Sequence, residues 1–383
     1  MRKLAILLLL AGTASPAFAA NPVTVDMVDQ LLIYAHGKSD AKVAEELFDL
    51  ELTERVSSAR LQRWEAELPG PKSRQAMVAL ADASVFLRLP PDEIPGSPAL
   101  GRDAQDSLLT LSRTYIEDTI PKLPNFFATR NTTLFSDEPL TINTITMSNS
   151  PYKQMHLVGT SSDKAYFREG KEVIISNTDK HASPSPKGLY TQGVFGEAIE
   201  LVLSDILPSG PVWSHWEGGP DNPLAVFRYT VPREKSHYTV NVNDDPRSNP
   251  PSVAYHGEIA IDPADGTIRR LTAVAELNAN SPMSKADVMV QYGPVEIGGA
   301  SYICPIRSVS FGVVRTFNSA PSFQSRYGPA TTMPGPSVTK VNDVQFTEYH
   351  RFRAETRILT GDAATPDAPP PASGSALNPP PNQ

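Results

Sequence analysis

The segment Tyr255–Leu277 reads YHGEIAIDPADGTIRRLTAVAEL, and it decides the fold class. Apolar Tyr255, Ile259 and Ile261 alternate with other residues before the turn sequence DPADG, and a second strand-like run follows it. Proline at the second position of this turn favours type I geometry, and Gly266 can take the left-handed conformation that closes a hairpin. The segment therefore predicts two antiparallel strands joined by a tight turn.

The same period of two continues on both sides of this hairpin. Further strands are predicted at residues 152–159, 164–176, 224–231, 237–242, 253–262, 287–292, 295–306, 308–315 and 339–358. Apolar Phe227 and Tyr229 fall on one face and polar Arg228 and Thr230 on the other, which is typical of an antiparallel sheet with one face buried and one in water. We expect a large curved antiparallel sheet, a half-barrel, covered by one helix at Phe195–Leu207.

The first third of the chain reads as helical. Helices are predicted to begin at Thr24, Ser39, Thr53, Lys72 and Asp103, the last ending near Thr119, and each carries a single apolar stripe. We therefore predict an α+β protein with a helical domain at residues 20–128 and an antiparallel β half-barrel domain at residues 129–360.

Both ends of the chain have a biased composition. Basic Arg2 and Lys3, the apolar run Leu4–Ala11 and the small residues Ala17 and Ala19 predict a signal peptide at residues 1–19, cleaved near Ala19. The alternative of an uncleaved anchor is disfavoured because this run is too short to span a bilayer. We expect a periplasmic or secreted protein without an integral membrane segment. Residues 361–383 are rich in proline and are predicted to form a disordered tail.

Charge and cysteine content exclude several classes of function. The chain has 34 basic and 42 acidic residues, a net charge of −8, which repels phosphates and argues against nucleic acid as a partner. Cys304 is the only cysteine, so no intramolecular disulfide can form. Because it lies in an apolar strand-like run, we predict a buried and unreactive thiol.

No sequence signature of catalysis is found. The chain lacks a nucleophile elbow, a metalloprotease motif and a glycine-rich phosphate loop, and its seven histidines do not fall in pairs at ligand spacing. We predict that the protein is not an enzyme and uses no cofactor. A weak metal site formed by His237 and His256, on the polar faces of two strands, is left open.

Aromatic residues gather in the central part of the chain. We take five of them as candidate lining of a ligand groove: Trp213, Phe227, Tyr229, Tyr238 and Tyr255. Two interpretations compete. These rings form either a packed core beneath the covering helix, or an apolar groove that admits an acyl chain or a partner segment.

Three motifs resemble the periplasmic lipoprotein-carrier (LolA/LolB/RseB-like) superfamily. They are the hairpin at Gly257–Gly266, the strand pair at Val295–Pro305 and the closing strand at Phe346–Phe352, within a resemblance that spans Tyr152–Ile358. It implies a curved half-barrel with helices over its concave side, where several members bind lipid chains. The whole chain, including LTERVSSARLQRWEAELPGP and LPNFFATRNTTLFSDEP, is more similar to an uncharacterised family of exported bacterial proteins.

These observations lead to three functional hypotheses. The first is an exported, non-catalytic binding protein that holds a lipid, a lipoprotein acyl chain or a partner segment in an apolar half-barrel. The second is a scaffold that recognises an envelope protein through the helical domain. The third, an envelope-polymer hydrolase, requires paired carboxylates in a cleft, and no such pair stands out in the sequence.

Overall fold

The structure is a computed structural model, and it describes residues 21–138, 154–174, 204–206, 209–219, 222–240, 251–279, 281–319 and 332–351. The chain divides into two units, Met1–Phe352 and Arg353–Gln383, and every described residue lies in the first. The predicted signal peptide, most of the predicted helix at Phe195–Leu207 and the predicted tail at 361–383 lie outside the described residues.

The chain begins with a small helical domain. It contains α1 (Val25–Ala35), α2 (Asp40–Phe48), α3 (Ser58–Glu67) and α4 (Pro71–Ser84), with a parallel pair of short strands, β1 (Asn21–Val23) and β2 (Leu50–Leu52). Side chains cap two of the helices, because Thr24 accepts a hydrogen bond from the Met27 N–H and Ser57 from the Arg60 N–H. The apolar stripes of the helices meet in one core that includes Val28, Leu47, Trp64 and Met77.

Two of the predicted helix boundaries were wrong. The helix predicted for Ser39–Leu52 ends at Phe48, because residues 50–52 pair with the first strand instead. The next helix begins after its cap Ser57 rather than at Thr53. A three-residue strand is too short to show a period of two, so the sequence pattern did not separate it from the helices around it.

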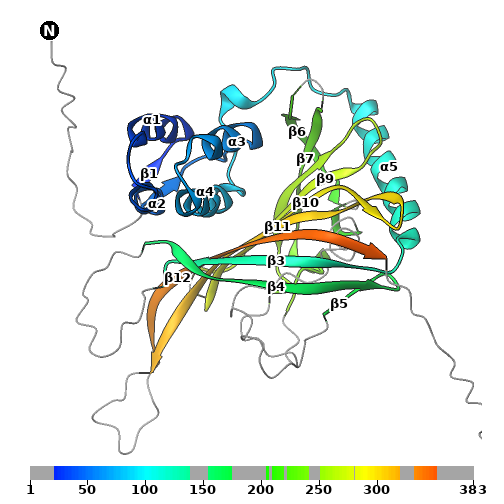
Figure 1. Cartoon of the computed structure of the whole chain (residues 1–383). Coiled ribbons are helices and arrows are strands. Elements are labelled where there is room, and N and C mark those ends of the chain that lie inside the picture. The colour runs from blue at the N-terminus through cyan, green and yellow to red at the C-terminus, as the bar shows by residue number, and fades with distance from the viewer. Residues whose placement is uncertain are drawn as a thin grey trace, which may run out of the picture. The chain divides into compact units, whose positions relative to one another are not determined.

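Ten strands form one open antiparallel sheet, as predicted (Figure 1). Their order across the sheet is β5-β4-β3-β12-β11-β10-β9-β8-β7-β6, so β5 and β6 are the edges. The strands are β3 (Phe126–Ser136), β4 (His156–Arg168), β5 (Lys171–Ile174), β6 (Val212–Glu217), β7 (Leu224–Val231), β8 (Tyr255–Ile261), β9 (Ile268–Ala275), β10 (Met283–Ile297), β11 (Ala300–Ser319) and β12 (Thr332–Arg351).

The hairpin predicted from DPADG is confirmed as β8 and β9. Gly266 has φ +75°, in the left-handed region, and its N–H donates to the Asp262 carbonyl at 2.9 Å. Residues 237–242, by contrast, were predicted as a strand, and this is wrong for 237–240, the part that the structure describes. His237 and Tyr238 are irregular there, and Thr239 makes one isolated bridge to Ser252. A short helical turn, η4 (Arg233–Lys235), precedes this segment.

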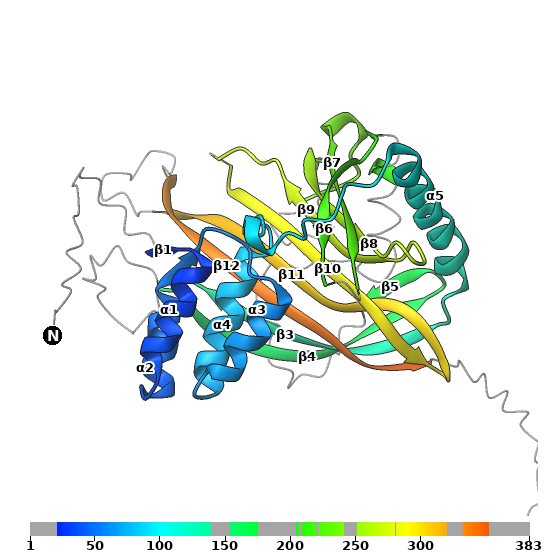
Figure 2. The ribbon, with the colours of Figure 1, turned by 90° about the horizontal axis from the view of Figure 1, so that it is seen from above.

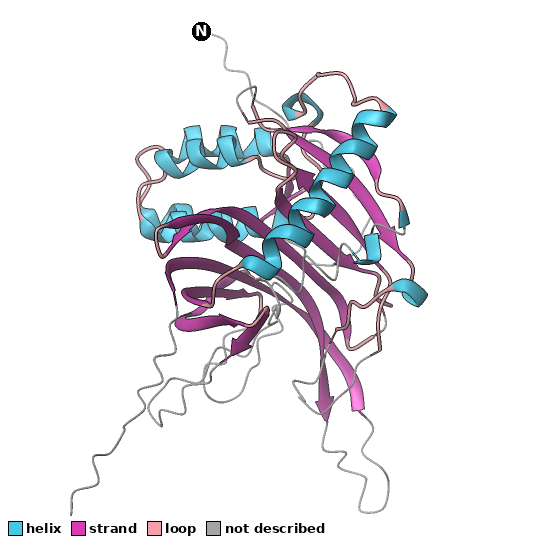
Figure 3. Cartoon of the chain, turned by 90° about the vertical axis from the view of Figure 1, so that its right-hand side faces the viewer, coloured by secondary structure: helices cyan, strands magenta, loops and turns pink. Residues whose placement is uncertain are grey.

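The long helix α5 (Arg102–Thr119) was correctly located but was counted with the helical domain at residues 20–128. It packs against the sheet, where Leu108 and Ile116 join the core of the strands and the Ser112 hydroxyl donates to the Gly266 carbonyl at 2.7 Å (Figure 3). An apolar stripe does not reveal whether its partner is a helix or a sheet. The predicted boundary after residue 128 also falls inside β3.

The two faces of the sheet have different partners. The apolar face carries Phe227, Ile259, Leu271 and Val290 and is covered by α5. The opposite face, which we call the docking face, is covered in part by α1–α4, and Figure 2 shows these helices well separated from α5. Short one-turn helices, η1 (Pro91–Glu93) and η2 (Ile120–Lys122), flank α5 in the chain.

The prediction that the second face lies in water was therefore wrong for its central part. Phe135, Met289, Val309 and Val341 are buried there against Ala79 of α4. These apolar residues follow the strand period as closely as those of the other face, so the strands β3, β10, β11 and β12 carry apolar side chains on both sides.

Candidate functional site

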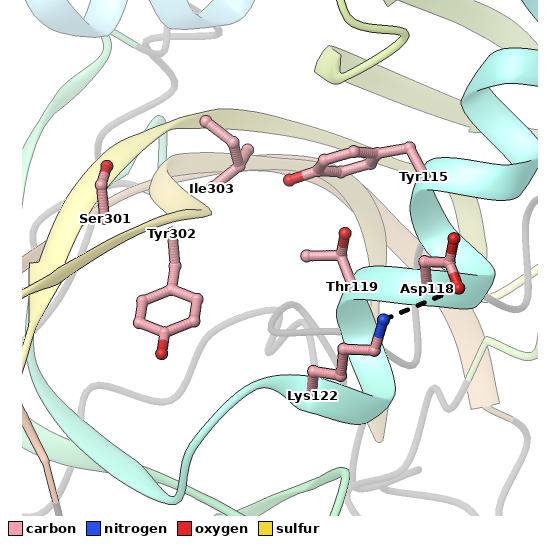
Figure 4. Close-up of a pocket in the computed structure, with 7 residues that line it drawn as sticks. All are labelled: Tyr115, Asp118, Thr119, Lys122, Ser301, Tyr302 and Ile303. Carbon is pink, nitrogen blue, oxygen red and sulfur yellow. Dashed lines mark ion pairs between the residues drawn. The ribbon is translucent and has the colours of Figure 1, made fainter.

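A pocket of about 410 Å³ opens between the end of α5 and β11 (Figure 4). Tyr115, Asp118 and Thr119 line it from α5, Lys122 from η2, and Ser301, Tyr302 and Ile303 from β11. Helical spacing explains the α5 side, because residues 115, 118, 119 and 122 share one face of a helix. The volume lies within the ~300–1,000 Å³ range of small-molecule sites.

The pocket has an apolar wall and a charged rim. Tyr115, Tyr302 and Ile303 are half-buried and pack against the core of the apolar face, so the wall continues that core to the surface. At the rim, the Lys122 amine lies 3.7 Å from the Asp118 carboxylate, and both side chains are mostly exposed (Figure 4). An exposed pair of this kind separates easily, so Lys122 is available to an anionic group.

Burial also determines the chemistry of the Tyr115 hydroxyl. Burial raises the pKa of Tyr115, the hydrogen bond with Thr119 opposes this, and the charge of Asp265 adds to it. The phenol is neutral at physiological pH, as an ordinary tyrosine is, and can donate a hydrogen bond to a ligand in the pocket.

The five aromatic residues predicted to line a groove lie together on the apolar face. The Trp213 and Phe227 rings meet edge to face at 5.6 Å and the Tyr229 and Tyr255 rings at 5.8 Å. The Tyr238 ring is tilted against the Tyr255 ring, with 5.3 Å between their centres. Phe227, Tyr229 and Tyr255 are at most 4% exposed, and none of the five lines the pocket at α5.

Buried hydroxyl groups anchor two of these rings. Tyr229 donates to the Thr272 carbonyl at 2.5 Å, and Tyr255 donates to the Asp205 carboxylate at 2.9 Å. Asp205 also accepts from the His237 N–H at 3.0 Å, and the His237 ring contacts it at 2.6 Å. The contacts of this buried carboxylate with Tyr255 and His237 hold Asp205 against the sheet.

A buried ionic cluster lies on the docking face at β6 and β9. Glu217 contacts Arg55 of the helical domain and makes a two-pronged contact with Arg270, at 2.5 and 2.9 Å. Burial alone would raise the pKa of Glu217, but Arg270, the hydrogen bond with His215 and Arg55 together hold it well below its usual range. Glu217 therefore stays ionised and ties the helical domain to the sheet.

The same cluster contains a serine, a histidine and a carboxylate in contact. Ser214 Oγ lies 2.7 Å from His215 Nδ1, and His215 Nε2 lies 2.9 Å from Glu217 Oε1. The order resembles that of a catalytic triad. However, both Glu217 oxygens already contact arginines, and the pocket at α5 is lined by none of these residues. We interpret the contact as part of the ionic cluster.

Cys304, His237 and His256 were also singled out in the sequence. Cys304 is 1% exposed, and burial raises its pKa to about 12, so the prediction of a buried thiol is confirmed. The His237 ring contacts Asp205, whereas the His256 ring contacts Glu276 at 3.4 Å. Across the described ranges, no group of three or more His, Cys, Asp or Glu side chains could hold a metal ion.

Sequence reasoning missed every residue that lines the pocket. Tyr115 was assigned to a helix stripe and Tyr302 to a strand, but no pattern indicated that the two meet across 187 positions of chain. A local signal existed in Gly298 and Gly299, both at positive φ, which turn β10 back into β11 and bring residues 301–303 toward α5.

Comparisons with known proteins give one distant similarity. No protein-family model matches the chain, and no curated protein matches it. Among solved structures, a LolA superfamily protein from Nitrosomonas europaea aligns with 65% of this chain and 93% of its own, at 11% sequence identity and a TM-score of 0.24. None of the helices in the described part of the chain is long and apolar enough to cross a membrane.

Proposed function

We propose that this protein is an exported, non-catalytic binding protein that holds the acyl chain of a lipid or lipoprotein in the pocket between α5 and β11. The observation that carries the proposal is the composition of this pocket. Its inner wall, Tyr115, Tyr302 and Ile303, continues the core of the apolar face, and its rim presents Lys122. An apolar chain with an anionic head matches both parts.

Export is part of the proposal. The predicted cleavage site near Ala19 precedes β1 by two residues, and the Asn21 N–H donates to the Asp49 carbonyl at 2.9 Å. A chain cleaved at this site keeps every residue that the structure describes. The intact mass of protein from the periplasmic fraction tests this, and a mass that includes residues 1–19 would count against it.

Lipid binding is tested by native mass spectrometry and lipid extraction of protein isolated from the periplasm, followed by titration with a fluorescent fatty acid. Ile303→Asp should weaken fatty-acid binding at least about tenfold, because a carboxylate at the apolar wall must be desolvated by the bound chain. Ile306→Asp is the matched control, since Ile306 lies on the same strand but is 41% exposed and outside the pocket. Equal binding by the two variants would refute the proposal.

A scaffold function has one specific observation in its favour. Three large apolar side chains of α1, those of Met27, Ile33 and Tyr34, are 53–75% exposed. Apolar patches at a protein surface often mark contacts with other proteins. If the protein acts as a scaffold, Tyr34→Ser should abolish co-purification of an envelope protein and leave fatty-acid binding unchanged. If it acts as a carrier, the Ile303→Asp variant should show the loss instead.

A further inference from the structure

One part of the docking face lies beyond the helical domain, and its side chains are exposed or half-buried. It is formed by β4, β3 and β12, where Phe127 pairs with Tyr166 on one side and with His350 on the other. The Phe127 ring lies 5.9 Å from the Tyr166 ring and 5.2 Å from the His350 ring, and Lys164 Nζ lies 4.8 Å from the Phe127 ring centre. We call Phe127, Tyr166 and His350 the aromatic patch.

Basic side chains surround the aromatic patch. Because alternate residues of a strand share a face, Lys164 and Arg168 lie on the same side of β4 as Tyr166, and Lys171 pairs with Arg168 from β5. All three are exposed, and Glu169 contacts Arg168 at 3.6 Å. In a chain with a net charge of −8, this is a local basic region.

Next to the patch, a row of polar side chains crosses the same three strands. Ser162 Oγ donates to Asn131 Oδ1 at 2.8 Å, and Asn131 Nδ2 donates to Thr347 Oγ1 at 3.3 Å. All three residues are exposed, so each hydroxyl or amide keeps capacity for further hydrogen bonds. Mutual bonds hold the row in place, which lowers the entropy cost of binding a ligand there.

The backbone of β12 is irregular at this point. A bulge lies between Thr347 and His350, and Glu348 has φ +52°, a left-handed conformation that is uncommon for residues other than glycine. The Glu348 carboxylate accepts a hydrogen bond from Thr129 at 2.7 Å. Bulges and such outliers are over-represented beside functional sites because they redirect side chains.

From these contacts we propose that this surface binds an anionic polysaccharide. The C–H face of a sugar ring packs on Phe127, as apolar groups do on aromatic rings. Sugar hydroxyls bond to the polar row of Ser162, Asn131 and Thr347, and carboxylate or phosphate groups of the polymer pair with Lys164, Arg168 and Lys171. This site lies on the opposite side of the sheet from the apolar face, so it is independent of acyl-chain binding.

The test is affinity electrophoresis of the processed full-length protein in native gels containing polygalacturonate, with dextran as the neutral glycan. Polygalacturonate should retard the protein and dextran should not, and added salt should weaken the retardation. Lys164→Gln should weaken binding about fivefold, equivalent to about 1 kcal/mol. Phe127→Ser should weaken it more, provided that its melting temperature stays near that of the parent protein.

The chain offers a matched control. Lys285 Nζ lies 5.4 Å from the Phe311 ring in a similar cation–aromatic contact on the same face, but next to the helical domain. Lys285→Gln should leave the retardation unchanged. Absence of retardation, equal retardation by dextran, an equal loss in the Lys285→Gln variant, or tighter binding of a single-stranded oligothymidylate would each overturn the proposal.

Discussion

At the residue scale, Gly266 joins the β8–β9 turn to α5. Its φ of +75° disfavours any side chain, and a Cβ there would lie 2.7 Å from Leu111 Cγ and 2.9 Å from backbone atoms of Leu111 and Ser112. Gly266→Ala should therefore lower the free energy of unfolding by about 2–5 kcal/mol, the sum of left-handed strain and overpacking.

Gly37→Ala separates these two contributions. Gly37 has φ +86°, but nothing lies within 4 Å of a Cβ at this position. The Gly37→Ala variant should therefore lose only the free energy of unfolding that comes from left-handed strain, about 1–2 kcal/mol, as measured by urea denaturation. If both variants lose the same free energy of unfolding, the contacts of α5 with a Cβ at residue 266 contribute nothing to the loss.

Asp287 should make stability depend on pH. The carboxyl lies in β10 and is 5% exposed, and among the described residues Oδ1 has no hydrogen-bond partner. Burial raises the pKa of Asp287 to about 6, against the opposing charge of Lys285. Because the folded pKa is above the unfolded value of about 3.9, this group stabilises the fold fully below about pH 4, and the contribution is lost as pH rises through about 6.

Replacing Asp287 by Asn should remove this dependence. Between about pH 4 and 7, the parent protein should lose up to about 3 kcal/mol of its free energy of unfolding, whereas Asp287→Asn should not show this loss. The size follows from the shift of about two pKa units. Urea denaturation at several pH values measures it, with the exposed Asp106→Asn as control. Parallel pH profiles for the parent and Asp287→Asn would contradict the expectation.

At the element scale, α4 is attached to the sheet by one cation between two carboxylates. Arg307 of β11 contacts Asp82 of α4 and lies 2.8 Å from Asp343 of β12. Burial raises the pKa of Asp82 well above its usual range, Arg307 opposes this, and Asp343 adds to it. Arg307→Met leaves both carboxylates buried without a cation, so it should cost about 3–5 kcal/mol in chemical denaturation.

Two further variants test the origin of this loss. The double variant Arg307→Met with Asp82→Leu should regain part of the stability, because it removes one of the stranded charges. Arg113→Met breaks only the exposed Arg113–Glu117 pair of α5 and should cost less than about 1 kcal/mol. A loss no larger for Arg307→Met than for Arg113→Met would show that α4 is held by its apolar contacts alone.

Single strands could be predicted from the sequence, whereas contacts between distant elements could not. Strand β7 was predicted with its observed bounds, because apolar Phe227, Tyr229 and Val231 alternate with exposed Arg228 and Thr230. The attachment of the helical domain was not predictable. Arg55 and Glu217 are 162 positions apart, and each reads as an ordinary surface charge until the fold brings the two together.

The five candidate aromatic residues show a related limit. The period of two placed Phe227, Tyr229 and Tyr255 on one face correctly, since this depends only on local geometry. Whether the rings fill that face or leave a groove depends on the elements that cover them. Those elements are distant in the sequence, so a local pattern does not identify them. The pocket at Tyr115 and Tyr302 lies at another edge of the same apolar layer.

At the scale of the whole molecule, the two layers differ in how far each can fold alone. The core of the helical domain consists only of residues between Val23 and Leu80. The docking face, in contrast, has Phe135, Met289 and Val309 buried against that domain. A fragment of residues 21–101 therefore keeps its own core, whereas a fragment of residues 102–383 exposes an apolar surface.

We expect the helical fragment to unfold cooperatively in a thermal melt followed by circular dichroism. The sheet fragment should bind a hydrophobic dye and associate on size-exclusion chromatography, because large exposed apolar patches drive association. Mixing the two should restore a one-to-one complex without dye binding, since the contacts of Arg55 with Glu217 and of Asp82 with Arg307 form again. A monomeric sheet fragment that binds no dye would mean that the docking face is stable in water. The helical domain would then be free to separate from the sheet when the helical domain meets a partner.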